Sequence, residues 1–373
     1  MPFYTLFTQM EQQKTGILVK KLLKWLIPLS LILFIQLLKF FPSVIEKYYS
    51  TGLYVYMVTT LRTITGFIPF SIGDILYFIV LAGCAFTAIK FVIKLIKKEA
   101  QWKYSVLKLL QFIRRLLWVY ITFYLLWGLN YYRSGITAQL HLKVENYSTE
   151  DLCNITNLLI DKTNKSRLAL SKDSLLPQPA IKDIYQEAVT NYKGIASTFP
   201  FLHYKVKSVK RSLYTAFAPY FGFTGYYNPF SGEAQLRDDV PRILIPYTVS
   251  HEMAHQLGYA SETEANFAGY LAAANSTDNY FKYSVYLDLY RYARIELMMR
   301  NVLPDNNYKL DSLVKMDLRN INRFFLKERN RVSGKVMNLY GMYLQANNQQ
   351  KGINSYDDVI SLLIAYYKQY GKI

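Results

Sequence analysis

SHEMAHQLGYASETEANF, Ser250–Phe267, holds two of the four histidines of this 373-residue chain. His251 and His255 stand in the arrangement H-E-x-x-H, and residues four apart share one face of a helix. Both imidazoles can therefore reach one zinc ion, Zn²⁺. Glu252 follows the first histidine, where its carboxylate can take a proton from a metal-bound water. The pattern predicts a catalytic zinc site on a helix.

A catalytic zinc ion also needs a third protein ligand and an open position for water. Gly258 follows His255 by three residues, and a glycine there can end the helix in a left-handed turn. Glu262 and Glu264 come soon after this turn. Spacing alone allows either carboxylate to swing back to the metal, so the residues predict a site of two histidines and one glutamate.

Two simpler interpretations remain: the histidines belong to an ordinary charged helix, or they form a zinc site that is only structural. Glu252 argues against the structural site, because a purely structural ion needs no neighbouring base. The other histidines, His141 and His203, are isolated and are more typical of structural positions. His203 precedes the motif, and we keep it as a candidate for polarising a substrate carbonyl.

Three apolar runs precede residue 133, and each has about the length that crosses a bilayer. They predict membrane helices at about residues 22–41, 73–93 and 113–132. The chain is 51% hydrophobic, which also favours a membrane region joined to a globular part. Only two cysteines are present, Cys84 and Cys153, so a four-cysteine metal site is excluded.

The net charge of +18 concentrates among these apolar runs, because residues 1–132 hold 15 Lys/Arg against 4 Asp/Glu. Basic residues cluster before the first run and between the second and third: Lys14, Lys20, Lys21, Lys24, Lys94, Lys97, Lys98, Lys103, Lys108, Arg114 and Arg115. The positive-inside rule then predicts a cytoplasmic N-terminus. Three spans would place residues 133–373 outside the cytoplasm. No nucleic-acid motif is present, so neither DNA nor RNA is an expected partner.

Residues 133–373 predict a mainly helical domain with a small sheet beside the H-E-x-x-H helix. GYYNPFSGEAQL, Gly225–Leu236, combines β-forming residues with Gly and Pro, as short strands do. A strand there can bind an extended substrate as an added strand, with Tyr226, Tyr227 and Glu233 facing the cleft. The alternative is a loop that closes the core. The predicted fold is thus a three-helix membrane region followed by an α+β zincin-like domain.

Other polar residues lie near the predicted elements. Asp74 borders the second span and is either a functional ionisable residue or, as we favour, part of a helix cap. Tyr286, Tyr290, Arg291 and Arg294 follow one another on a later helix, where one could stabilise an oxyanion. Helical stripes of Tyr and Arg are more often packing and surface.

ETEANFAGYLAA, Glu262–Ala273, resembles the second motif of gluzincin metallopeptidases. In that family a ligand glutamate begins a helix, and an Asp or Asn four residues later supports a ligand histidine. The resemblance implies that Glu262 is the third ligand and Asn266 the support, with Glu264 held in reserve. This sequence departs from the family because gluzincins place that helix far downstream, whereas here it follows the motif almost at once.

The whole chain resembles a family of uncharacterised bacterial membrane proteins that have three N-terminal spans and an H-E-x-x-H domain. The resembling stretches are Pro69–Tyr77, Gly225–Leu236, Ile245–Phe267 and Gly352–Tyr367. The resemblance implies a zinc metallopeptidase of the bacterial inner membrane, with its catalytic domain periplasmic or extracellular. Its substrates would be peptides or proteins of the cell envelope. The alternative is a non-catalytic membrane scaffold that retains a structural zinc.

Overall fold

The computed structural model describes residues 22–97, 102–171, 173, 175–302, 309–349 and 358–373. The basic residues Lys14, Lys20, Lys21 and Lys98, which support the predicted orientation, lie outside this part of the chain. The membrane-side elements are helix Leu22–Leu38, α2 Pro42–Val44, the π-helical η1 Ile45–Leu53, α3 Tyr54–Gly66, α4 Ile72–Ile96 and α5 Trp102–Leu126.

The rest of the described chain is a mainly helical globular part with one small sheet. Its helices are η2 Gly128–Tyr132, α6 Gly135–Gln139, α7 Thr149–Leu170, α8 Ile181–Ile195, η3 Pro200–Leu202, η4 Thr215–Phe217, α9 Ala218–Phe221, η5 Arg242–Leu244, α10 Ile245–Gln256, α11 Glu262–Ala274, α12 Asn279–Met299, α13 Ser312–Glu328, α14 Arg331–Ala346 and α15 Val359–Tyr370.

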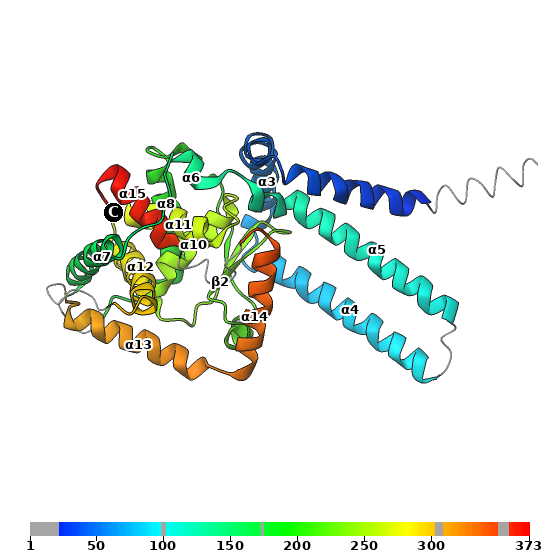
Figure 1. The fold of residues 1–373 in the computed structure, drawn as a ribbon. Coiled ribbons are helices and arrows are strands. Elements are labelled where there is room, and N and C mark those ends of the chain that lie inside the picture. Colours follow the sequence, from blue (N-terminus) through cyan, green and yellow to red (C-terminus); the bar gives the residue numbers. More distant parts are fainter. Residues whose placement is uncertain (1–21, 98–101, 172, 174, 303–308, 350–357) are drawn as a thin grey trace, which may run out of the picture.

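Two helices are long and apolar enough to cross a membrane, namely α4 and the segment Ser105–Leu126 of α5. A third span is counted if Leu22–Leu38 and Pro42–Gly66, bent by 102° at their junction, form one span. These long helices project from one side of the globular part (Figure 1). The predicted third span, 113–132, is shifted, because α5 ends at Leu126. Its apolar tail is buried in protein instead of lipid.

The sheet has the strand order β1-β3-β2, made from β1 Val209–Arg211, β2 Gly225–Asn228 and β3 Glu233–Leu236. β2 runs antiparallel to β3 and lies at an edge, whereas β1 runs parallel to β3. Gly225 lies directly against α10: a Cβ on it would stand 2.7 Å from Oε1 of Glu252. The small sheet therefore lies beside the helix that carries the H-E-x-x-H motif.

The main core surrounds α10 and α11, which are buried along almost their whole length. The helices α7, α8, α12 and α15 cover them and contribute most of the remaining core side chains. Gly269 of α11 lets the two central helices approach closely, since a Cβ there would lie 2.9 Å from the backbone nitrogen of His251. This close approach brings the first turn of α11 near the histidines.

A second, separate apolar cluster joins the membrane helices to the globular part, and we call it the junction cluster. Its buried members are Ile35, Ile45, Tyr49, Tyr54, Val58, Ile121, Tyr124, Trp127, Leu129, Tyr131 and Ala260. The sequence assigned all residues before 133 to a membrane region. In the structure, η1 and α3 pack instead against the loop that connects α10 to α11.

Candidate metal centre

The two histidines of the motif lie on consecutive turns of α10, and both are buried. Pro246 stands in the first turn of α10, where its missing N–H costs no helical hydrogen bond. The rings of His251 and His255 have centroids 4.6 Å apart and stand nearly perpendicular to each other. The helix therefore presents two imidazoles to one point, as the spacing predicts.

The turn after α10 reverses the chain in a Schellman motif. Gly258 has φ +87°, and its N–H donates to the carbonyl of His255 at 2.9 Å. The next residue, Tyr259, donates its N–H to the carbonyl of Ala254 at 3.2 Å. A side chain at Gly258 would also meet the ring of Tyr54 at 2.9 Å. Glycine is thus required here by both backbone conformation and space.

Glu262, the first residue of α11, points its carboxylate at both histidines. Its Oε2 lies 3.2 Å from Nε2 of His251 and 3.6 Å from Nε2 of His255. Ligand atoms about 2.0–2.1 Å from a tetrahedral zinc ion stand about 3.3 Å from one another. The two observed spacings lie on either side of this value, so the Glu262 carboxylate stands at a distance from each imidazole that one zinc ion could bridge.

The ring of His255 is held in one orientation by the backbone. Its Nδ1 lies 2.7 Å from the carbonyl oxygen of Tyr259, so Nδ1 carries the proton and donates it. Nε2 is then the nitrogen left to bind a metal or to receive a second proton. The same turn that delivers Glu262 therefore also selects the tautomer of the second ligand.

The pKa values of Glu262 and His255 are both shifted in the direction that favours the charged form of each group. Burial would raise the pKa of Glu262, but hydrogen bonds with the two histidines hold it well below its usual range. Burial would lower the pKa of His255, yet its hydrogen bond to Glu262 and the nearby carboxylates raise it to about 9. In the metal-free protein, a proton on His255 thus supplies the positive charge that a metal would bring.

Glu252 is buried at the wall of a pocket of about 390 Å³. Burial raises the pKa of its carboxyl to about 7, although the two imidazoles oppose this shift. Its Oε2 has no hydrogen-bond partner among the described residues. His251, Glu252 and His255 offer ligand atoms within 4.8 Å of one another. Glu262 brings its Oε2 within 3.2 and 3.6 Å of the two Nε2 atoms, so both glutamates stand at the histidine pair.

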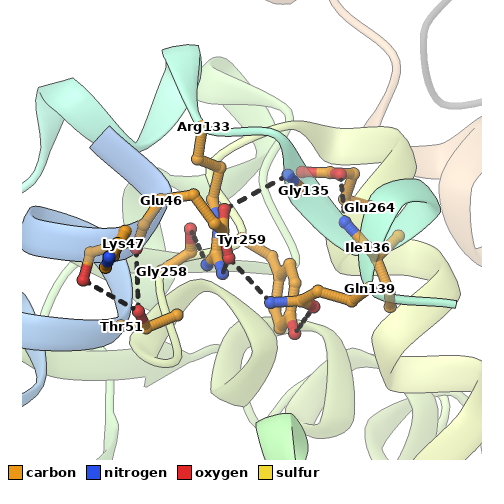
Figure 2. Close-up of polar contacts among 10 residues, drawn as sticks. All are labelled: Glu46, Lys47, Thr51, Arg133, Gly135, Ile136, Gln139, Gly258, Tyr259 and Glu264. Carbon is orange, nitrogen blue, oxygen red and sulfur yellow. Dashed lines mark hydrogen bonds and ion pairs between the residues drawn. The ribbon is translucent and has the colours of Figure 1, made fainter. Parts of the chain in front are cut away.

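Arg133 holds the turn after α10, and Figure 2 shows it between Glu46 and Gly258. Arg133 forms a two-fold ion pair with Glu46 of η1, at 2.7 and 2.8 Å, and donates to the carbonyl of Gly258 at 3.1 Å. Its guanidinium also stacks over the ring of Tyr259 at 4.8 Å. Gln139 bridges Glu46 to the hydroxyl of Tyr259. The turn beside the ligand histidine is therefore fixed by the segment that follows the first apolar helix.

Glu264, the alternative candidate for the third ligand, binds the backbone at the start of α6 instead of the histidines. Its Oε1 accepts the backbone N–H of Ile136 at 2.7 Å, at the start of α6 (Figure 2). Asn266, the predicted support residue, is buried and lines the same pocket as His251. The backbone carbonyl of Asn266 accepts the hydroxyl of Tyr247 at 3.0 Å. Of the two glutamates, the structure brings only Glu262 to the histidines.

The other predicted site residues do not gather at one place in the structure. Tyr226 lines the pocket, but its hydroxyl donates to Asp74 at 2.6 Å. Tyr227 is directed to the junction cluster, where its ring lies 5.4 Å from that of Trp127. Glu233 is fully buried beneath the membrane helix α4 and does not face the cleft. His203 is exposed after η3 and does not line the pocket.

The residues singled out on α12 do not form the site. Arg291 is paired with Asp288, and Tyr286 is buried in the main core. Tyr290 and Arg294 line another pocket, between α12 and α13. The packing interpretation of this tyrosine and arginine stripe therefore fits the structure.

Two residues that contact Glu262 were not found from the sequence. The hydroxyl of Tyr340, on α14, donates to Oε1 of Glu262 at 2.7 Å. The side-chain oxygen of Gln349 accepts the N–H of Glu262 at 3.1 Å. Both lie more than seventy residues after Glu262 in the sequence. The chain has 34 tyrosines, and nothing around Tyr340 distinguishes it from the others as a site residue. Tyr340 thus orients the carboxylate of Glu262, and Gln349 fixes the backbone at the start of α11.

Fold and site together define a class: a mainly helical protein with a small sheet, two or three helices long and apolar enough to cross a membrane, and a buried His–Glu–His cluster at a pocket. The family model described as Protein of unknown function (DUF3810) matches residues 49–364. Because the match covers most of the chain, the protein belongs to this family. The matched region contains all of α3, most of the junction cluster, and the three residues His251, His255 and Glu262, which we call the metal cluster. No curated protein matches the chain, and no solved structure does.

Proposed function

We propose that the protein is a membrane-anchored zinc metallopeptidase. The observation that carries this proposal is the position of the Glu262 carboxylate, 3.2 and 3.6 Å from the two Nε2 atoms, beside a buried Glu252 at the pocket wall. Two imidazoles and one carboxylate are a donor set typical of catalytic zinc. His251, His255 and Glu262 would hold the ion, and a bound zinc ion supplies an acidified water and polarises a carbonyl.

Glu252 is suited to move the proton during peptide hydrolysis. A base works best when its pKa is close to the working pH, and burial raises the pKa of this carboxyl to about 7. The same carboxyl can then return the proton to the leaving amine. Gly225 of β2 lies directly against this carboxyl, since a Cβ there would stand 2.7 Å from Oε1 of Glu252, so the strand holds one side of the base in place.

The edge strand β2 is the proposed binding site for the substrate backbone. One edge of β2 pairs with β3, and the other is not part of the sheet. An extended peptide can add to such an edge by backbone hydrogen bonds, which suits substrates of varied sequence. Residues Gly225 and Tyr226 of β2 line the pocket together with His251 and Glu252.

The pocket also favours catalysis over a purely structural zinc. Structural sites are closed by four protein ligands, whereas catalytic sites keep one position for water. Here His251, one of the three proposed ligands, lines a pocket of about 390 Å³ together with Glu252. A scaffold that only retained zinc would need neither the pocket nor the buried base.

For orientation, we propose that the globular part lies outside the cytoplasm. Lys90, Lys94 and Lys97 stand toward the end of α4 that lies away from the sheet. The positive-inside rule places these residues on the cytoplasmic side. A reporter fused after the C-terminus tests this, because activity of a cytoplasm-only reporter would reverse the orientation.

The experiment that tests the function compares the purified full-length protein with its Glu252→Gln variant on a peptide library. Both proteins are loaded with zinc, and metal content is measured on the same samples. We expect one zinc per chain in both and cleavage only by the wild type. The exposed Glu145→Gln variant serves as a control and should cleave normally. Equal cleavage by Glu252→Gln, or no cleavage by the zinc-loaded wild type, contradicts the proposal.

A further inference from the structure

The membrane helix α4 begins directly on the sheet. Both carboxylate oxygens of Glu233, on β3, accept backbone N–H groups of its first turn, from Ile72 at 3.2 Å and Gly73 at 2.6 Å. A carboxylate there also compensates the positive end of the helix dipole. A Cβ on Gly73 would lie 2.4 Å from the side chain of Asn228, so helix and sheet are in close contact.

A second bond links α4 to the wall of the pocket. Asp74 accepts the hydroxyl of Tyr226 at 2.6 Å and the backbone N–H of Leu213 at 2.8 Å. Asp74 is buried in the first turn of α4, but it is not the cap: the N-cap is Ser71, whose hydroxyl oxygen accepts the N–H of Asp74 at 3.0 Å. Tyr226 belongs to β2 and lines the pocket. The proposed substrate strand is thus fixed to the end of a membrane helix.

The length of α4 sets the height of the sheet above the bilayer. The apolar run Ile75–Ile93 is about 28 Å long at 1.5 Å per residue, close to the hydrocarbon thickness of about 30 Å. Lys94 and Lys97 follow this run and mark its far end. Hydrocarbon therefore begins immediately after Asp74, and the strands that bind the first turn lie at the level of the lipid headgroups.

The metal site is attached to the second span in a similar way. α5 ends at Leu126, and the next residue, Trp127, contacts the second ligand histidine. Its indole N–H donates to the carbonyl of His255 at 3.4 Å, and the two ring centroids are 6.0 Å apart. The site therefore lies one side chain beyond the end of a span, although about 120 residues separate them in the sequence.

The helix α14 forms the other wall of the pocket and lies at the same level. Tyr124, in the last turn of α5, donates to the side-chain oxygen of Asn347 at 2.8 Å, just after α14. In Figure 1, α14 lies next to the start of α4 and crosses the direction of the spans. Val336, Met337 and Tyr340 of α14 line the pocket.

A neighbouring face of α14 exposes apolar side chains at helical spacing. These are Val332, Leu339, Met342 and Tyr343, with exposed fractions of 50, 66, 65 and 38%. Such a stripe costs free energy in water, whereas a helix that lies in a membrane interface buries it among headgroups and acyl chains. Its bond to the end of α5 makes the bilayer that holds α5 the natural occupant of this face.

We propose that the pocket opens at the bilayer surface, and that its substrates are polypeptides anchored in the same membrane. Cleavage would fall a few residues from the point where the substrate leaves the bilayer. The apolar window of α4 has no buried residue, so a membrane anchor of the substrate has room beside it. This substrate class rests on the proposed peptidase activity, whereas the height of the pocket does not.

The height is tested without any activity measurement. Nitroxide labels are placed at Leu339→Cys on α14 and, as the matched control, at Met299→Cys on α12, both exposed positions. Cys84 and Cys153 are first replaced by alanine. The full-length protein is reconstituted into phosphatidylethanolamine–phosphatidylglycerol vesicles that contain a nickel-chelating lipid. We expect nickel to relax the label at position 339 and not at 299. Equal relaxation at both positions, or none at 339, overturns the proposed height.

The substrate class is tested with an anchored peptide library in the same vesicles. Three libraries carry the same randomised twelve-residue segment on a membrane helix. In the first library the segment follows the helix directly. In the second it follows a rigid helical spacer of about 25 residues, and in the third a Gly/Ser spacer of equal length. The rigid spacer lifts the segment by about 37 Å, whereas the flexible one lets it return. We expect cleavage of the first and third libraries and nearly none of the second.

Outcomes of this experiment separate the two proposals. Equal cleavage of all three libraries contradicts the substrate class and leaves the peptidase intact. If zinc-loaded protein cleaves neither the anchored libraries nor the soluble one, the peptidase and its substrate class both fail. The label measurement then still decides whether the pocket opens at the membrane. Cleavage must disappear in Glu252→Gln for any of these results to count as the protein's own activity.

Discussion

The metal cluster and the junction cluster meet at His255, but they are assembled in different ways. The metal cluster comes from one continuous stretch, in which a helix, a Schellman turn and a second helix deliver three side chains. The junction comes from the first apolar helix, η1, α3, the end of α5 and a single residue after α10. The comparison teaches that the chemistry of the site is local, whereas its placement at the membrane depends on distant segments.

The largest expected effect is a chemical one, confined to the metal cluster. Glu252→Gln keeps the shape of the side chain but removes the base, and general-base catalysis contributes about 10²–10⁴-fold. We expect kcat/KM for peptide cleavage to fall by about 10³-fold with zinc content unchanged. A variant that loses its zinc would instead show that this residue is a ligand.

The next largest effect separates the two glutamates of α11. Glu262→Gln should weaken zinc binding by more than about 100-fold, because it removes a ligand and not only a partner of one. The matched control is Glu264→Gln, which removes the bond to Ile136 and should change zinc affinity little. Affinity is measured by competition with a chelator of known strength. A reversed order of the two variants would move the third ligand to Glu264.

At the junction, Arg133→Met leaves Glu46 without its ion-pair partner. Breaking a buried pair typically costs about 3 kcal/mol, so we expect a clearly lower unfolding temperature. The matched control is Arg211→Met, whose partner Asp238 is lost from an exposed pair worth less than about 1 kcal/mol. Similar unfolding temperatures for both variants would show that the junction does not stabilise the turn.

A smaller effect is expected where α14 touches the metal cluster. Tyr340→Phe removes the hydroxyl that donates to Oε1 of Glu262 and leaves the ring in place. Loss of such a partner should lower zinc affinity by about tenfold. Tyr343→Phe on the same helix removes a hydroxyl that bonds to Tyr131 instead, and should leave zinc affinity unchanged. Equal effects of both variants would mean that α14 acts only through its packing.

The smallest expected signal is the proton released when zinc binds. The pKa of His255 is raised from 6.5 to about 9, so its protonated form stabilises the metal-free protein below pH 6.5. This stabilisation is lost as the pH rises toward 9. Zinc binds the neutral ring, and binding at pH 7.5 should release roughly one proton, falling toward none above pH 9. Calorimetry in buffers of different ionisation enthalpy measures this number. The measurement is made in the Glu252→Gln variant, because the carboxyl of Glu252 would otherwise also exchange protons in this pH range.

The sequence predicted the local part of the site well, because each step of it is a short-range rule. The spacing of His251 and His255 places both rings on one face of a helix, and Gly258 takes the predicted left-handed conformation. The glutamate expected from the resemblance, Glu262, is the one that reaches both rings. Whether these residues bind zinc and cleave peptides stays a prediction.

The non-local part could not be predicted from patterns in the chain. About 120 residues of chain separate the last apolar run from the motif, yet Trp127, directly after α5, contacts His255. The apolar residues 128–132 have a composition typical of a span, yet they are buried against protein. Tyr226 lines the pocket as predicted, whereas Tyr227, predicted beside it, packs against Trp127 of the junction cluster. Such contacts depend on packing between segments far apart in sequence.

The most direct test of the central claim is the zinc K-edge X-ray absorption spectrum of the zinc-loaded full-length protein. We expect two imidazole nitrogens and two oxygens at about 2.0–2.2 Å, from His251, His255, Glu262 and water. In Glu262→Gln this pattern should be lost, whereas Glu264→Gln should retain it. A spectrum with sulfur ligands, or one that Glu262→Gln leaves unchanged, would contradict the site described here.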